Sequence, residues 1–350
     1  MKFVKRLTSL SAGIAFILAS LGMAASAQGI PNAPPPFNKS GMTLALVMYL
    51  SVGDYFEAYE AGVVAQAKAA GIRLRVFEGK QDAAAMRNQI QQAISLGVNG
   101  ILIDHGPPEA VKDLIQKALK AGIKVVIKET SVDNAAVPQI SQNDHAMARL
   151  VLDQALKDNG TKFDAGYIYV PGFNPTDLRN DIWKAVKKAN PGIQEKARWG
   201  AINSTIAATV ASQTAAALRA HPDITVVFAP FDEYARGVKL GAEESGFAHK
   251  IKIYSIDIST SDIQEMREPQ SPWAATAAVD ARVIGEVSLR TLALLVAGEH
   301  VPHLVEMKPV LITRDFLLKN DIKTLDQLKA KLPALGHSDI STAAWLPDIK

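Results

Sequence analysis

Short apolar segments alternate with longer amphipathic segments along the chain from Met42 to Thr313. The apolar segments, such as LALV, ILI and VVI, are apolar at nearly every position, which is typical of parallel strands buried on both faces. The longer segments carry apolar residues at helical spacing. This alternation predicts an α/β protein built from doubly wound parallel sheets.

The boundaries of the expected elements follow from this pattern and from its Gly and Pro breaks. In the first half we expect strands at 43–49, 73–77, 100–104, 124–128 and 137–141, and helices at 55–70, 82–96 and 108–121. In the second half we expect strands at 165–170, 197–201, 225–229, 252–256, 274–278 and 310–313, and helices at 146–157, 178–189, 206–220, 232–244, 263–267 and 281–297. The two sheets should be of similar size, with a ligand cleft at the carboxyl ends of their strands.

The first 27 residues have the pattern of a cleaved secretory signal. Basic residues precede an apolar stretch, and Ala25-Ser26-Ala27 places small residues where a signal peptidase cuts. The stretch is too short and too interrupted by Ser and Gly to span a bilayer. We therefore expect a signal peptide at 1–27, a mature chain that starts at Gln28 in the periplasm, and a proline-rich lead-in at 28–41.

Composition excludes several classes of function. The chain has 38 Lys and Arg against 35 Asp and Glu, and three of the basic residues but no acidic ones lie in the expected signal, so the mature chain is formally neutral. No nucleic-acid partner is therefore expected. The chain has no cysteine, which excludes disulfides and thiolate sites. It shows no nucleophile elbow, phosphate-binding loop or zinc-protease motif, so we expect no catalytic residue, metal or cofactor.

Aromatic and polar residues follow two of the first strands. The loop after the first strand ends in Asp54, Tyr55 and Phe56. Aromatic faces match the C–H faces of a sugar ring, and a carboxylate accepts hydrogen bonds from hydroxyls. The two aromatic residues would also suit the buried start of a helix, and this alternative stays open. His105 follows the third strand, either as a ligand contact or as a structural residue.

Charged residues also follow later strands. Glu129 ends the VVIK strand and is costly to bury without hydrogen-bond donors, so it should face the cleft or a cation. Arg179 is expected at a helix start, where the dipole disfavours a cation unless a ligand or carboxylate compensates. A solvated arginine is the alternative. Phe231 and Asp232 follow another strand, with Asp232 as a helix N-cap. Asp257 follows a buried strand and is free to bind a ligand.

Several segments together resemble the type I periplasmic binding proteins of sugar ABC importers, the ribose-binding-like group. The resemblance covers about Met42 to Thr313. LALVMYLSVGDYFEAYEAGVVAQAKAAGIRLRVFEG looks like the first strand, aromatic loop and helix of that group. QIQQAISLGVNGILI and ALKAGIKVVIKET are similar to later segments of its first lobe, and ISQND to its first crossover between lobes. AHPDITVVFAPFDEYARGVKLGAEESG and KIYSIDIS are similar to segments of its second lobe.

This resemblance implies two lobes, joined by a hinge of three strands, that close on a ligand. Lobe one would comprise residues 42–142 and 279–308, and lobe two residues 143–278 and 309–315. The hinge would lie near 141–144, 279–281 and 308–310. Residues 316–350 would form a C-terminal extension, to which we assign no role.

The resemblance also implies ligand contacts. It places Tyr55 and Phe56 at the family's aromatic positions, Glu129 and Asp257 at its strand-end acids, and Arg179 at its sugar-binding arginine. Together with the analysis of the strand ends, this predicts a site formed by Tyr49, Asp54, Tyr55, Phe56, His105, Glu129, Asn143, Arg179, Phe231 and Asp257.

The chain departs from the group's pattern at Thr130, Phe231 and Val279, where many relatives carry Arg, Asn and Gln respectively, so a cationic donor and two polar contacts are missing. A less polar cleft suits a ligand with fewer hydroxyls, because unpaired buried hydroxyls are costly. We therefore expect a small neutral ligand, such as a short polyol, a deoxy sugar or a furanose sugar, and not an acid.

The expected function is that of a monomeric substrate-binding component of an ABC importer, with a membrane permease as its partner. A sensor-type receptor for a furanosyl signal or other small solute is the first alternative. A secreted carbohydrate-active enzyme is the second. A transcription regulator of the lac-repressor type has the same fold but needs an N-terminal helix-turn-helix, where this chain has an export signal.

Overall fold

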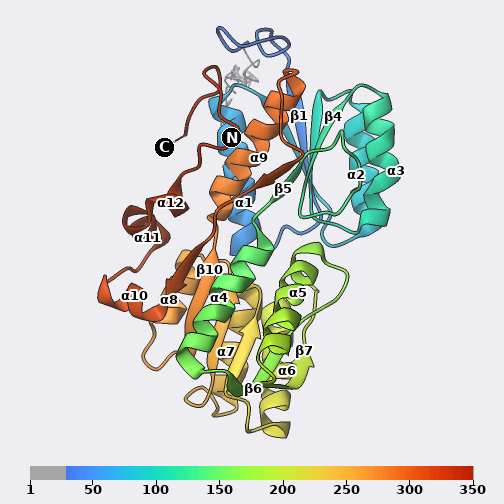
Figure 1. Cartoon of the computed structure of the whole chain (residues 1–350). Coiled ribbons are helices and arrows are strands. Elements are labelled where there is room, and N and C mark those ends of the chain that lie inside the picture. The colour runs from blue at the N-terminus through green and yellow to red at the C-terminus, as the bar shows by residue number, and fades with distance from the viewer. Residues whose placement is uncertain (1–28, 350) are drawn as a thin grey trace, which may run out of the picture.

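The protein consists of two α/β lobes, one above the other, in a computed structural model that describes residues 29–349 (Figure 1). Each lobe has a six-stranded sheet, with strand orders β11-β5-β4-β3-β1-β2 and β12-β10-β9-β8-β6-β7. The pair β10–β12 is antiparallel, and the other pairs between the described strands are parallel. The predicted fold class is therefore confirmed. The expected signal peptide lies outside the described residues.

Lobe one contains the strands of the first sheet and the helices around it. Its strands are β1 (Thr43–Met48), β2 (Arg73–Glu78), β3 (Gly100–Asp104), β4 (Lys124–Lys128), β5 (Gln139–Ser141) and β11 (Leu304–Glu306). Its helices are α1 (Asp54–Ala69), α2 (Ala83–Ser95), α3 (Pro108–Lys120) and α9 (Ala281–Val296). Strand β11 was not predicted, because its three residues bury a single side chain and leave no apolar run to recognise.

Lobe two is built in the same way. Its strands are β6 (Lys162–Ile168), β7 (Gly192–Trp199), β8 (Val226–Ala229), β9 (Lys252–Ile256), β10 (Trp273–Ala278) and β12 (Val310–Thr313). Its helices are α4 (Asp144–Asn159), α5 (Asn174–Ala189), α6 (Ile206–Ala220), α7 (Asp232–Glu244) and α8 (Thr260–Arg267). Several predicted boundaries were wrong, two of them by four or five residues. Edge strand β7 begins five residues before the predicted start, because its exposed alternate positions are polar. Helix α5 begins four residues early, so Arg179 lies in its second turn and not at its start.

The chain passes between the two sheets three times. It crosses at 141–144 between β5 and α4, at 278–281 between β10 and α9, and at 306–310 between β11 and β12. These crossings form the predicted three-strand hinge and lie side by side between the lobes (Figure 1).

Two glycines bring α1 and α9 into direct backbone contact in lobe one. A Cβ atom on Gly62 would lie 2.0 Å from the carbonyl oxygen of Arg282, and one on Gly285 would lie 2.2 Å from that of Tyr59. No larger residue fits at either position without moving a helix. This close packing holds the start of α1, which carries the predicted aromatic residues, against the element that leaves the second crossing.

The C-terminal extension runs along one side of both lobes (Figure 1). Helices α10 (Arg314–Lys319), α11 (Leu325–Lys331) and α12 (Pro333–Gly336) lead from the end of β12 towards lobe one. Lys329 Nζ donates to Asp280 at the second crossing, 2.7 Å away, and the guanidinium of Arg290 on α9 donates to the carbonyl of Ser338, 2.8 Å away. The extension therefore contacts the hinge and both lobes. No helix within residues 29–349 is long and apolar enough to cross a membrane.

Candidate ligand-binding cleft

A cavity with a volume of about 480 Å³, including its mouth, lies between the two lobes. It is at the carboxyl ends of the parallel strands, where ligands of doubly wound folds bind. Its lining comprises Leu50, Tyr55, Phe56, His105, Gln142, Phe173, Pro175, Thr176, Arg179, Ile202, Ile206, Phe231, Tyr234 and Asp257. Six of the ten predicted site residues are in this lining: Tyr55, Phe56, His105, Arg179, Phe231 and Asp257.

Left-handed backbone conformations turn the chain at four strand ends around the cavity. His105, Glu129, Asn143 and Asp257 have φ of 57°, 51°, 66° and 78°, and they follow β3, β4, β5 and β9. This conformation is uncommon for residues other than glycine and tends to occur at functional sites. Two of the four, His105 and Asp257, contribute side chains to the cavity lining.

Arg179 is buried and fixed by groups of its own lobe. Its Nε donates to Asp144 Oδ1 at 2.7 Å, and its Nη1 donates to the carbonyl of Pro230. Its Nη1 also lies 3.9 Å from Asp257 Oδ2. Asp144, the first residue of α4, was not predicted as part of the site. It is the carboxylate that compensates this buried cation, because each charge would be costly to bury alone.

Three polar atoms of the cavity lining have no partner among the described residues. They are Asp257 Oδ1, Gln142 Oε1 and the Tyr55 hydroxyl. Burial raises the pKa of Asp257 to about 6, although the charge of Arg179 acts in the opposite direction. Buried polar atoms in native proteins are nearly always paired, so these three are suited to hydrogen bonds with a ligand.

Glu129 and Asn143 lie beside the cavity, at the first crossing. Glu129 Oε1 accepts a 2.8 Å hydrogen bond from the backbone N–H of Gln142. Burial and the nearby charge of Asp144 raise the pKa of Glu129 well above its ordinary value. The Asn143 side chain accepts from the backbone N–H of Ala146 and caps α4. Both side chains thus support the hinge, and neither is part of the cavity lining.

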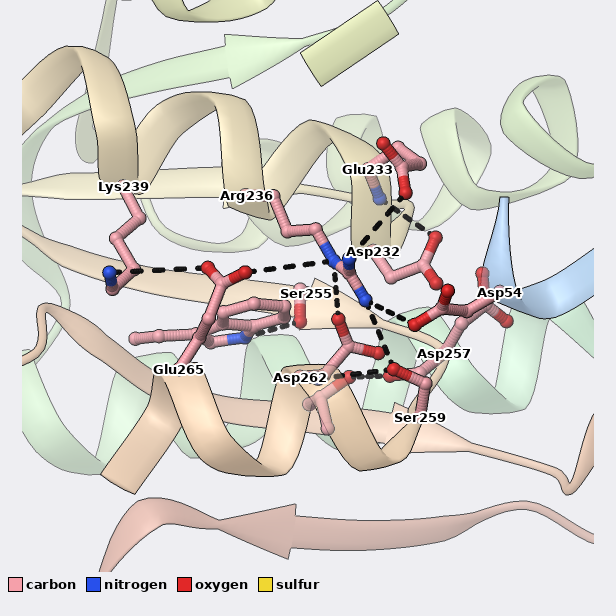
Figure 2. A network of polar contacts seen from close by, with 12 residues as sticks. Asp54, Asp232, Glu233, Arg236, Lys239, Ser255, Asp257, Ser259, Asp262 and Glu265 are labelled. Atoms are coloured by element: carbon pink, nitrogen blue, oxygen red, sulfur yellow. Dashed lines mark hydrogen bonds and ion pairs between the residues drawn. The ribbon is translucent and has the colours of Figure 1, made fainter. Parts of the chain in front are cut away.

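Tyr49 and Asp54 lie outside the cavity lining as well. The Tyr49 hydroxyl donates to the carbonyl of Gln81 at 3.0 Å, and its ring centroid lies 6.2 Å from that of Phe173 in the other lobe. Asp54 Oδ2 accepts a 2.7 Å hydrogen bond from Arg236 Nη2 of lobe two (Figure 2). These contacts join the two lobes outside the cavity.

His105 is held by buried polar groups and also faces the cavity. Its Nδ1 lies 3.0 Å from Asp104 Oδ1, which also accepts from the buried Lys128 Nζ at 3.0 Å. Its ring contacts Phe56 edge to face, with the centroids 5.3 Å apart, and lines the cavity. Burial, with the charge of Lys128, lowers the pKa of His105, so the ring is neutral at neutral pH.

The polarity of the cavity lining changes across the second sheet. Along the order β9-β8-β6-β7, the lining residues in the loops after the strands are Asp257, Phe231, Phe173 and Ile202. Neighbouring strands are about 4.8 Å apart, so the lining becomes apolar over roughly 14 Å. The cavity therefore has a polar end towards β9 and an apolar end towards β7.

Comparison with known proteins identifies the family. A profile described as "Periplasmic binding protein domain" matches residues 44–300. The chain belongs to the periplasmic binding protein family. This confirms the family resemblance seen in the sequence.

Three relatives of this periplasmic binding protein are informative. The ribose import binding protein RbsB of Bacillus subtilis is 23% identical over 270 residues, covering 75% of this chain and 85% of that protein. The 5-methylthioribose transporter solute binding protein of Thermotoga lettingae, solved with 5-methylthioribose, is 36% identical with a TM-score of 0.86, covering 87% of this chain and 97% of that one. A sugar ABC transporter structure from Yersinia enterocolitica is 29% identical with a TM-score of 0.84, covering 87% and 93%.

Sequence reasoning missed several residues of the cleft in this periplasmic binding protein. Ile202 directly follows the predicted strand at 197–201 but was not singled out, because an apolar residue after a strand carries no polar signal of a ligand site. Ile206 and Tyr234 lie on helices, and helical spacing by itself does not tell a core position from a cleft position. Asp144 directly follows the predicted Asn143, so the acidic residue after the first crossover was the available signal.

Proposed function

We propose that this protein is the solute-binding component of a sugar ABC importer, acting as a periplasmic monomer that hands its cargo to a membrane permease. Family membership, the interlobe cavity and the three-strand hinge support this proposal. The export signal at residues 1–27 supports the periplasmic location. Closure of the lobes buries the cargo and holds it without chemical change.

The proposed cargo is a neutral pentose-type sugar with an apolar substituent, of the 5-methylthioribose class. The observation that carries this proposal is the change in polarity along the cavity. Sugar hydroxyls would pair with Asp257, Gln142 and Arg179 at the polar end. A methylthio group would pack against Phe173 and Ile206 at the apolar end, where sulfur–aromatic contacts are favourable.

The apolar end also argues against sugars with hydroxyls at every carbon. A buried hydroxyl without a partner costs about 1–3 kcal/mol. A buried CH₂ group contributes about 0.8 kcal/mol. Together these terms predict that 5-methylthioribose binds at least about tenfold more tightly than ribose. The liganded structure of the Thermotoga lettingae relative supports the same class.

Isothermal titration calorimetry on the mature chain would test this proposal. We expect binding of 5-methylthioribose, with ribose and allitol at least about tenfold weaker. Ile206→Ala should reduce this preference several-fold, whereas Leu240→Ala, on the exposed side of α7, should leave it unchanged. Small-angle scattering should show a smaller radius of gyration with 5-methylthioribose than without it. Equal affinity for ribose and 5-methylthioribose would refute the cargo class.

A further inference from the structure

A network of charged side chains outside the cavity joins the two lobes (Figure 2). Arg236 on α7 donates to two groups of its own lobe, through Nε to Asp262 Oδ1 at 2.8 Å and through Nη2 to Ser259 Oγ at 3.0 Å. The same Nη2 donates to Asp54 Oδ2 at 2.7 Å, and Asp54 is the first residue of α1 in lobe one. We propose that the Asp54–Arg236 pair is a latch that forms on lobe closure and strengthens cargo binding without contacting the cargo.

The lobe-two half of this latch is built before closure. Asp262 has a fully buried side chain, and its backbone N–H donates to Ser259 Oγ at 3.1 Å, which caps α8. When the lobes separate, Arg236 keeps these partners and loses its bond to Asp54. Because the guanidinium is already oriented, closure fixes few additional rotatable bonds and loses little side-chain entropy. Most of the free energy of the new hydrogen bond therefore stabilises the closed state.

Arg236 also offsets an excess of acidic groups at this junction. Asp232, Glu233, Asp262 and Glu265 surround it on lobe two (Figure 2). Without the arginine, closure would bring Asp54 towards these carboxylates and would be opposed by repulsion. With it, hydrogen bonds from Arg236 and Ser259 outweigh partial burial and lower the pKa of Asp54, which keeps it charged.

The latch is placed to act on the closing equilibrium. Neither Asp54 nor Arg236 lines the cavity. A contact made only in the closed form raises the closed population, and apparent affinity follows that population. Side-chain exposures of 35% for Asp54 and 18% for Arg236 limit the strength of the pair. We expect the latch to account for about threefold to tenfold in affinity.

Calorimetry with 5-methylthioribose tests this inference, which rests on the proposed function. Asp54→Asn should weaken binding by about threefold to tenfold, through faster dissociation. The effect should shrink in 1 M NaCl, because salt screens a part-exposed pair. Glu57→Gln is the matched control, since Glu57 is an exposed acid on the same helical turn. Wild-type affinity of Asp54→Asn would overturn the latch.

A double-mutant comparison distinguishes the latch from direct ligand binding by Asp54. In an Arg236→Gln background, verified as folded by circular dichroism, Asp54→Asn should cause little further loss of affinity. Arg236→Lys, which keeps the charge, should recover part of the loss. If Asp54→Asn were equally damaging with and without Arg236, Asp54 would act on the cargo and the latch would be wrong.

A second measurement needs no cargo. Gln81 Nε2 of lobe one donates to the carbonyl of Asn203 of lobe two at 3.3 Å, and the chain has no cysteine. In a Gln81→Cys/Asn203→Cys protein, which has no other thiol, a short bis-maleimide cross-linker can therefore trap the two lobes when they are closed. Asp54→Asn should slow this trapping about threefold to tenfold. If the wild type failed to bind 5-methylthioribose, the proposed cargo would be wrong. The trapping rates, which need no cargo, would still test the latch. Equal trapping rates would overturn it.

Discussion

Replacement of Asp257 by asparagine should stabilise the unliganded protein while weakening cargo binding. Asp257 is 2% exposed, and its Oδ1 has no partner among the described residues. Its nearest cation is Arg179, with Nη1 3.9 Å from Oδ2, and Arg179 already binds Asp144. Burial accordingly raises the pKa of Asp257 from 3.8 to about 6. The buried charged carboxylate of Asp257 therefore destabilises the unliganded folded protein, and we expect a ligand to offset this by hydrogen bonding to it.

The size of this effect depends on pH. Above pH 6 the carboxyl group is ionised in the folded and unfolded states, and at about 1.4 kcal/mol per pKa unit the charged folded form costs about 3 kcal/mol. Below pH 4 it is protonated in both states and this cost vanishes. The buried asparagine amide would keep an unpaired group of its own. We therefore expect Asp257→Asn to gain about 1–3 kcal/mol at pH 7 and little at pH 4.

Urea unfolding at the two pH values, without ligand, measures this gain. Asp133→Asn is the control, because Asp133 is exposed and should show no change. In calorimetry at pH 7, Asp257→Asn should bind 5-methylthioribose about tenfold to a hundredfold more weakly, since a hydrogen bond to a charged group is lost. A destabilised Asp257→Asn protein at pH 7, a gain equal at both pH values, or unchanged affinity would contradict this reasoning.

Two substitutions and a deletion test the packing around the cleft, with urea unfolding as the common measurement. Arg179→Ala should weaken binding about tenfold to a hundredfold and lower stability by about 3–5 kcal/mol, because Asp144 would be buried without its cation; wild-type stability would count against the pair. Gly62→Ala should lower stability by about 3 kcal/mol by forcing α1 from α9, and a neutral effect would argue against the close approach. Deletion of 337–350 should lower stability by a similar amount, because buried Arg290 loses carbonyl acceptors; an unchanged midpoint would show that the extension is dispensable.

The fold was largely predictable because its signals are local. Strands buried on both faces are apolar throughout, so β3, β4 and β9 were predicted with the boundaries that the structure has. Edge strands carry a weaker signal, which explains the late start predicted for β7 and the failure to predict β11. The family resemblance supplied the order of the crossings.

The site was predictable only in part. Residues directly after strands, such as Phe231 and Asp257, were found because parallel strands all end at the cleft. Which of two neighbouring residues faces the ligand depends on backbone conformation, and the left-handed turns at Glu129 and Asn143 direct both side chains to the hinge. Their role as ligand contacts stays a prediction, as does the whole set of site residues.

The sequence by itself determined the α/β class, the alternation of strands and helices, and the family, because these depend on side-chain periodicity and on local motifs. The tertiary structure decided which charges meet. Asp144 and Arg179 are 35 residues apart in the chain, and Asp54 and Arg236 are 182 apart. No local pattern encodes such pairs, since they exist only where folding brings separate helices together, within lobe two for Asp144 and Arg179 and between the lobes for Asp54 and Arg236. For the same reason, Asp54 is distinguished as a latch residue by the closed cleft and not by its own loop.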